Sequence, residues 1–181
     1  MPSSAKLNFV LQQGVPNVRA EECGVRYSAL MFQPRVIGLA VLIALILQSW
    51  YLFLPLSIVL WWNAFLPKFN PFDHFYNHVI ARPRGLPQLD QAPAPRRFAQ
   101  GMAATFMLGI ALSLMFGWRW TAWVLEAFLV VALALLNVGR FCLGSYIYHL
   151  SQGNVRFANN TLPWSRQGGK PPEGRERACR S

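Results

Sequence analysis

The sequence predicts an all-α integral membrane protein with four short transmembrane helices in two hairpins and a cytoplasmic interfacial amphipathic helix between them. Two long apolar blocks predict the hairpins: residues 36–66 carry no charge, and residues 101–138 carry only Arg119 and Glu126. Backbone in lipid must satisfy its own hydrogen bonds, so both blocks should be helical. Because a span needs about 20 residues, with roughly 17 as the lower limit, each block is interpreted as two spans joined by a tight turn.

The distribution of positive charge predicts the orientation of the hairpins. The formal net charge is +10, yet of the 17 basic residues the two predicted turns hold only Arg119. Cytoplasmic segments of membrane proteins carry such an excess of Lys and Arg, so we expect the N-terminus, central loop and C-terminus to be cytoplasmic. These segments should contact anionic lipid headgroups. We expect no nucleic-acid partner, because no basic and aromatic stripe lies on a recognisable nucleic-acid-binding fold.

The first hairpin follows a cytoplasmic N-terminal arm. Residues 1–26 are mixed and polar, and we expect them to be loosely ordered. The four-helix membrane domain should cover residues 27–150, with its first two spans at about 27–48 and 50–66. Nothing resembling a cleavable signal peptide precedes it, because no early apolar core is followed by a small-residue cleavage site.

The segment between the hairpins predicts a short interfacial helix at residues 70–80. Asn70 can cap a helix that Pro71 begins, and Asp73 stands where a capping-box acid would. At 100° per residue, one face is apolar and the other polar, which is typical of a helix lying in the headgroup layer. The apolar face holds Phe72, Phe75, Tyr76, Val79 and Ile80, and the polar face holds Asp73, His74, Asn77 and His78.

The second hairpin has spans at about 98–117 and 120–140, and we expect residues 141–150 to continue the fourth helix. Small residues recur at every fourth position of the third span and predict a ridge for close helix packing in lipid. We expect the partner of this ridge to be another span of the chain, with another protein as the alternative. The ridge comprises Gly101, Thr105, Gly109, Ser113 and Gly117. Residues 151–181 form a basic tail that we expect to be disordered.

Glu126 is the acidic residue within an apolar span, where a charge normally faces protein or water. One interpretation is a proton or cation relay. The other, which we favour, is a carboxyl group near the outer interface that reaches water or Arg119.

Two further groups have reactive side chains. His74 and His78 are spaced to share one metal ion on a helix, with Asp73 and His149 as further ligands. Headgroup contact explains the pair more simply, so we predict no metal site. Cys142 is a candidate thiol, although we expect it at a helix C-terminus, which disfavours a thiolate, and we favour a packed structural cysteine as the alternative. With Cys23 and Cys179 it falls on the predicted cytoplasmic side, so all three should be reduced.

Two sequence segments carry a resemblance to a known family. Pro95-Arg96-Arg97-Phe98-Ala99-Gln100-Gly101 opens the third span, and Arg140-Phe141-Cys142-Leu143-Gly144-Ser145-x-x-Tyr148 follows the fourth. Over roughly residues 20–150 the chain resembles a family of small bacterial four-span membrane proteins classed as a domain of unknown function. The family usually closes with F-C-L-G-C, and some relatives are fused to or encoded beside thioredoxin-like or rhodanese domains. The resemblance implies thiol or sulfur chemistry, but Ser145 replaces the second cysteine here.

Three functions follow as hypotheses. The first is a non-enzymatic accessory or scaffolding subunit of a larger respiratory or photosynthetic complex in the bacterial cytoplasmic membrane. No catalytic constellation or cofactor motif is recognisable, although the grooves between spans leave room for lipid, quinone or pigment. The second is a thiol or sulfur-handling partner of a thioredoxin-like or rhodanese protein, using Cys142. The third and weakest is a small transporter or proton pathway using Glu126.

Overall fold

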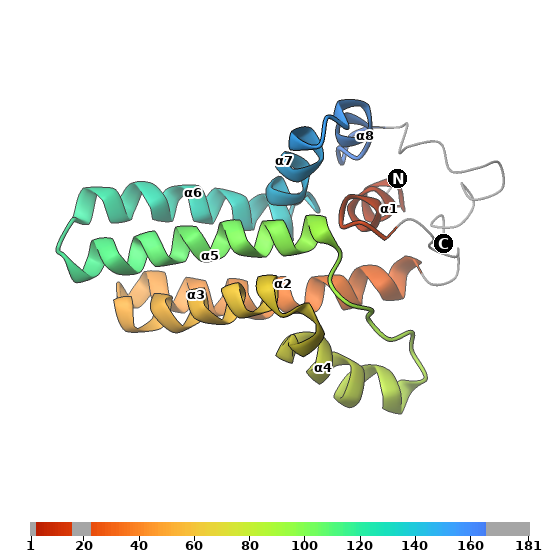
Figure 1. Ribbon diagram of the computed structural model, residues 1–181, viewed down its shortest axis with the longest axis horizontal. Coiled ribbons are helices and arrows are strands. Elements are labelled where there is room, and N and C mark those ends of the chain that lie inside the picture. The colour runs from red at the N-terminus through yellow and green to blue at the C-terminus, as the bar shows by residue number, and fades with distance from the viewer. Residues whose placement is uncertain (1–2, 16–22, 166–181) are drawn as a thin grey trace.

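The computed structural model describes residues 3–15 and 23–165, and all of its regular elements there are helical. Four long helices lie side by side and form an elongated bundle (Figure 1). Shorter helices gather at one end of this bundle, which we call the head, and the two tight turns lie at the opposite end (Figure 1). The long helices are α2 (Cys23–Leu47), α3 (Trp50–Phe65), α5 (Ala94–Met115) and α6 (Arg119–Asn137). The head contains α1 (Ser3–Gln12), α4 (Pro71–Phe75), α7 (Leu143–Ser151) and α8 (Val155–Asn160).

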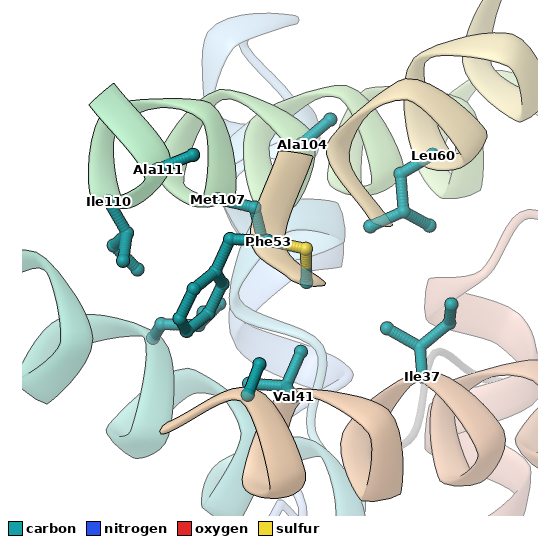
Figure 2. Close-up of a cluster of buried hydrophobic side chains, with 10 residues drawn as sticks. Ile37, Val41, Phe53, Leu60, Ala104, Met107, Ile110 and Ala111 are labelled. Atoms are coloured by element: carbon teal, nitrogen blue, oxygen red, sulfur yellow. The ribbon is translucent and has the colours of Figure 1, made fainter. Parts of the chain in front are cut away.

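The core of the bundle lies where α3 packs along α5 and both face α2. Figure 2 shows Phe53 of α3 and Met107 of α5 beside Val41 of α2, and all three side chains are completely buried. Helices α3 and α5 can approach closely because Ala104 of α5 has a small side chain. The Ser57 hydroxyl of α3 donates a 2.8 Å hydrogen bond to the backbone carbonyl oxygen of Ala104. A hydroxyl that bonds a neighbouring backbone in this way is a common link between membrane helices.

The two tight turns depend on residues with positive φ. Gly117 ends α5 at φ 77°, and the Trp118 N–H donates to the Ser113 carbonyl, which is the usual glycine-based end of a helix. Gln48 ends α2 at φ 47° and is not a glycine. Its side-chain Nε2 donates to the Leu45 carbonyl at 2.9 Å, so the side chain helps to satisfy the last turn of its own helix.

Within the described residues, three helices are long and apolar enough to cross a membrane: α2, α5 and α6. The fourth long helix, α3, is apolar and has 16 residues. Large apolar side chains stand exposed on the outer faces of the bundle, such as Ile46 at 81% and Phe128 at 62%. Long apolar helices whose outer faces are also apolar are characteristic of a multi-pass membrane protein.

The expectation that residues 141–150 continue the fourth helix is wrong. Helix α6 ends at Asn137, and Arg140 takes a positive φ of 54° before α7 begins at Leu143. Gly139 permits this break, because a Cβ there would lie 2.6 Å from the Leu135 carbonyl oxygen. The chain therefore changes direction at this point and enters the head.

The head also contains helices in segments that we expected to be unstructured. Residues 3–12 form α1, which buries Phe9 and Val10 against the start of α2, so a loosely ordered arm is wrong for this stretch. Residues 155–160 of the expected disordered tail form α8. Residues 16–22 and 166–181 lie outside the described part of the chain.

The interfacial segment begins as the sequence predicts, since the Asn70 side chain accepts a 3.0 Å hydrogen bond from the Phe72 N–H and Pro71 is the first helical residue. The helix then widens to a π-helix at Tyr76–Ala81 and ends in a 3₁₀ turn at Arg82–Arg84. The predicted division into faces is wrong for Asp73, which is buried, whereas Phe75 and Val79 of the apolar face and His74 and His78 of the polar face are exposed. Burial also raises the pKa of the Tyr76 hydroxyl, and nearby Arg84 opposes this shift.

Candidate functional site

A buried ion pair joins α4 to the first turns of α5. Arg96 donates to both oxygens of Asp73, through Nη2 at 2.8 Å and Nη1 at 3.2 Å, and the two side chains are 6% and 10% exposed. The planar guanidinium matches a carboxylate in this two-bond geometry, which fixes the orientation of both groups. The pair explains why Asp73 faces inward rather than toward water.

Three amide side chains complete this network, which we call the Arg96 network: Arg96, Asp73, Gln33, Asn70 and Gln100. Oε1 of Gln33 accepts hydrogen bonds from Arg96 Nη2 and Gln100 Nε2, both at 2.9 Å. Arginine has no acceptor, so Gln33 must turn its oxygen toward Arg96, and Gln100 must then turn its nitrogen toward Gln33. The remaining atoms, Gln33 Nε2 and Gln100 Oε1, are buried and have no hydrogen-bond partner within the described chain.

A cavity of about 180 Å³ lies beside the network, between α2, α5, α6 and the start of α7. Its polar lining comes from Gln13, Gln33, Gln100 and Cys142, and its walls are otherwise almost entirely apolar. The apolar walls include Ile37, Leu60, Met102, Phe106, Met107, Phe128, Leu129, Ala132, Leu133 and Leu136. An apolar pocket with a few convergent polar groups is the usual form of a small-molecule site.

Cys142 reaches the cavity from the turn before α7. It is a free thiol, 7% exposed, and its backbone N–H donates to Gln12 Oε1 at 2.9 Å. The expectation that it lies at a helix C-terminus is wrong, because it is the residue immediately before α7, at the helix end that favours negative charge. The expectation of a reduced thiol is also wrong for Cys23, which is disulfide-bonded. Cys179 lies outside the described residues.

The two sequence segments that carry the family resemblance pack against each other. Gly144 lies against α5 so closely that a Cβ there would be 2.7 Å from the Cα of Ala99. Phe98 contacts Tyr148 with ring centroids 5.7 Å apart. Ser145 is completely buried and donates a 3.3 Å hydrogen bond to the Pro95 carbonyl. The opening and closing segments therefore form one interface between α5 and α7.

Two other residues of these segments stabilise the ends of helices. Arg97 Nε donates a 2.8 Å hydrogen bond to the Ala64 carbonyl in the last turn of α3, where a basic side chain is favourable. Phe141 is buried, with its ring centroid 5.4 Å from that of Tyr146.

The small residues of the third span do not form one packing face. Gly101 faces α3 near Trp61, whereas Gly109 faces α6, where a Cβ would lie 3.0 Å from Leu125 Cδ1. Thr105 is exposed and donates to the Gly101 carbonyl within its own helix. Of the remaining two, Ser113 is buried and Gly117 belongs to the turn. A repeat of four drifts by about 40° per step on a helix of 3.6 residues per turn, so the ridge winds around α5.

Glu126 lies on α6 and is 7% exposed. Both of its carboxylate oxygens accept hydrogen bonds from Gln48 Nε2, each at 3.1 Å. Gln48 belongs to the turn between α2 and α3, so the carboxylate joins α6 to the first pair of long helices at the turn end of the bundle. No pattern in the chain identifies Gln48 as the partner of Glu126.

His74 and His78 lie exposed on the α4 segment, with parallel rings whose centroids are 6.2 Å apart. One ring nitrogen of His74 is 2.8 Å from the Lys68 carbonyl. His149 is buried in the head against the Gln12 carbonyl, and Asp73 is bound by Arg96. No group of three His, Cys or acidic side chains suited to a metal ion occurs in the described part of the chain.

Sequence reasoning missed three buried glutamines: Gln13 and Gln33, which line the cavity, and Gln12, which contacts Cys142. Gln33 lies in α2, and Gln12 and Gln13 lie in and just after α1, and each is 4% exposed or less. The available signal was a lone glutamine, Gln33, beside Pro34 near one end of an apolar span. A polar residue in that position normally has a protein partner.

A family model described as a domain of unknown function (DUF4395) matches residues 25–152. The chain belongs to this family. The matched stretch contains the Arg96 network, the cavity helices and the turn at Cys142, whereas α1 and α8 lie outside it. No curated protein and no solved structure matched the chain.

Proposed function

We propose that this chain is a non-enzymatic accessory or scaffolding subunit of a larger membrane complex, respiratory or photosynthetic, in the bacterial cytoplasmic membrane. In this proposal α3 is a fourth span, because it packs against α5 throughout the bundle core. Its 16 residues give about 24 Å of helix, which a locally thinned bilayer can accommodate. The two pairs α2–α3 and α5–α6 are then two membrane hairpins.

The charge at the two ends of the bundle supports cytoplasmic termini. Among the described residues, the head end carries most of the basic side chains, including Lys6 of α1, Arg96 of α5 and Arg156 of α8, whereas the turn end carries Arg119 at the start of α6. An excess of Lys and Arg in short segments marks the cytoplasmic side of a membrane protein. The head would then contact cytoplasmic proteins and anionic headgroups.

The outer face of α6 is the observation that carries the accessory-subunit proposal. In its most apolar 18-residue stretch only 17% of residues are buried, against 39% in α2 and in α5. Ala127 and Ala134 are exposed seven residues apart, with β-branched Val130 and Val131 between them. Small residues in lipid permit close approach of another helix, so this face suits a span of a partner subunit better than loose lipid chains.

The test is co-purification from native membranes in a mild detergent, using a C-terminal tag, with a mass-spectrometric inventory and an absorption spectrum. We expect a stoichiometric membrane complex. Ala127→Trp should remove the partner, because a bulky ring prevents close helix packing. The matched control is Ile58→Trp on the exposed face of α3, which should retain it. Recovery of the unaltered chain as a stable monomer without other subunits contradicts the proposal.

The second candidate function is a thiol or sulfur-handling partner of a thioredoxin-like or rhodanese protein. The position of Cys142 favours it, because this free thiol precedes a helix and lines a cavity at the end of the bundle. Without a cysteine at position 145, the second thiol of a disulfide exchange must come from the partner.

Replacement of Cys142 tests this second function. Cys142→Ser and Cys142→Ala should both abolish the cellular phenotype of the gene while leaving the amount of membrane-inserted protein unchanged. If the serine variant supports a wild-type phenotype, the thiol does no chemistry. If only the alanine variant fails, and its protein level falls, the residue has a packing role.

A further inference from the structure

We propose that the cavity between α2, α5 and α6 binds a single-ring quinol, with one ring hydroxyl joining Gln33 to Gln100. The inference goes beyond the accessory role, since it assigns a ligand to a site inside this chain. It rests on the hydrogen-bonding groups at the cavity wall, on the size and lining of the cavity, and on an apolar groove that neighbours it.

The first step is the unused hydrogen-bonding capacity of the two glutamines. Both are at least nine-tenths buried and line the cavity, and the Arg96 network leaves a donor, Gln33 Nε2, and an acceptor, Gln100 Oε1. The two side chains are already joined by a 2.9 Å hydrogen bond, so the unused atoms belong to adjacent groups. A hydroxyl can accept from the first and donate to the second, whereas a carbonyl oxygen can only accept.

This difference distinguishes a quinol from the corresponding quinone. A quinone carbonyl would satisfy Gln33 and leave Gln100 Oε1 buried without a donor. The glutamines cannot simply rotate their amides, because Arg96 donates to Gln33 Oε1 at 2.9 Å and Arg96 is itself bound by Asp73. Sites that bond a ligand hydroxyl discriminate strongly against the analogue that lacks it.

The second step is the size and chemistry of the cavity. A dry apolar cavity of about 150 Å³ in another protein holds benzene, so about 180 Å³ accommodates one substituted six-membered ring. Phe106 and Phe128 lie in the wall with ring centroids 6.5 Å apart. Met102 and Met107 also line it, and thioether sulfur packs favourably against aromatic rings.

The third step is a path for an apolar tail. A groove of about 340 Å³ runs along the outer surface between α2 and α6 and is lined by Gly38, Leu39, Leu42, Val130 and Leu133, among others. Leu133 lines both the groove and the cavity, so the two spaces are neighbours. A tail leaving the cavity past Leu133 would lie in this apolar groove, as the tail of a membrane quinol requires.

Cys142 supplies a reporter of occupancy, because its free thiol lines the same cavity. The probes are a decyl-trimethyl-substituted benzoquinol and the matching benzoquinone, whose rings have no unsubstituted carbon to which a thiol readily adds, added to the purified full-length chain in detergent under nitrogen. Alkylation of Cys142 by N-ethylmaleimide is followed by mass spectrometry of its peptide. Saturating quinol should slow alkylation at least about fivefold, and the quinone should need a roughly tenfold higher concentration for the same effect.

Two variants of α6 locate the site. Ala132→Phe fills the cavity and should abolish protection, whereas Ala127→Phe on the exposed face of the same helix should retain it. Gln100→Leu removes the acceptor without adding charge, so the quinol and quinone should then protect equally. If Ala132→Phe does not fold, Gln100→Leu still tests whether the ligand binds in this cavity.

Three results overturn the proposal. Protection by quinone at the same or a lower concentration than quinol removes the hydrogen-bonding argument. Protection that persists in a folded Ala132→Phe variant, or an unchanged preference for quinol in Gln100→Leu, places the ligand elsewhere. Absence of protection in the unaltered chain at saturating quinol means that the cavity does not bind this class.

Discussion

Replacing Asp73 by leucine would leave the Arg96 guanidinium buried without its counter-ion. Asp73 accepts three hydrogen bonds, from Arg96 Nη1 at 3.2 Å, Arg96 Nη2 at 2.8 Å and Asn70 Nδ2 at 2.9 Å. Each hydrogen bond to a charged group contributes about 1.5–3 kcal/mol. Loss of the two from Arg96 therefore agrees with the about 3–5 kcal/mol that removal of one partner of a buried ion pair usually costs.

A double variant separates the ion pair from the shape of the site. Asp73→Leu with Arg96→Met removes both charges and keeps similar apolar volume. Because the uncompensated guanidinium is then gone, the double variant should recover about 2 kcal/mol or more of the loss. Asp90→Leu is the control: Asp90 is exposed, and its replacement should change the free energy of unfolding by less than about 0.5 kcal/mol.

The assay is reversible unfolding in mixed micelles, followed by the fluorescence of the seven tryptophans. The free energies of unfolding of the unaltered chain, Asp73→Leu, Arg96→Met and the double variant form a double-mutant cycle, with Asp90→Leu as the surface control. If Asp73→Leu lowers the free energy of unfolding by less than about 1 kcal/mol, the reasoning is refuted, because an unpaired buried charge should destabilise the fold by more than that. A double variant less stable than Asp73→Leu would show that Arg96 is stabilised mainly by groups other than Asp73.

Three further variants test the packing of the head and the thiol site. Gly144→Ala should cost about 1–3 kcal/mol of unfolding free energy, because the added Cβ would overlap Ala99; an unchanged midpoint would contradict the close contact. Gly24→Ala has open space around its Cβ within α2 and should gain roughly 0.5–1 kcal/mol in the same assay. Ser145→Cys places a second thiol three residues after Cys142 at the start of α7, and mild oxidation should join the two; maleimide labelling that still counts both thiols would disprove this geometry.

The long helices were predictable because lipid imposes one simple requirement on a chain. Apolar stretches of sufficient length must be helical there, so the predicted limits of α2, α3, α5 and α6 fall within about four residues of the observed ones at nearly every end. The start of α4 was predictable for a local reason, because an Asn70 cap needs only the next two residues.

The site depends on contacts between residues distant in sequence, and there the patterns failed. Amphipathicity assigned Asp73 to water, but its partner Arg96 is 23 residues away and brings it inside. Gln33 binds Gln100 across 67 residues, and no periodicity links them. The break at Arg140 was missed because an apolar helix pattern continues on both sides of it, and one positive φ interrupts the helix.

The long-range contacts of α1 constrain the order in which the head folds during synthesis of the chain. The Asn8 side chain donates a hydrogen bond to the Leu162 carbonyl, 154 residues away, and the Gln13 side chain donates one to the Ser145 hydroxyl, 132 residues away. The Gln12 side chain accepts one from the Cys142 N–H. At about 5–20 residues per second, a ribosome needs roughly 7–30 s to synthesise the intervening chain. Phe9 and Val10 can pack against α2 soon after that helix is made, whereas Asn8, Gln12 and Gln13 reach their partners only after the four long helices have been synthesised. The head therefore assembles in two stages: the apolar packing of α1 on α2 forms first, and the hydrogen bonds of α1 to Cys142, Ser145 and Leu162 form later.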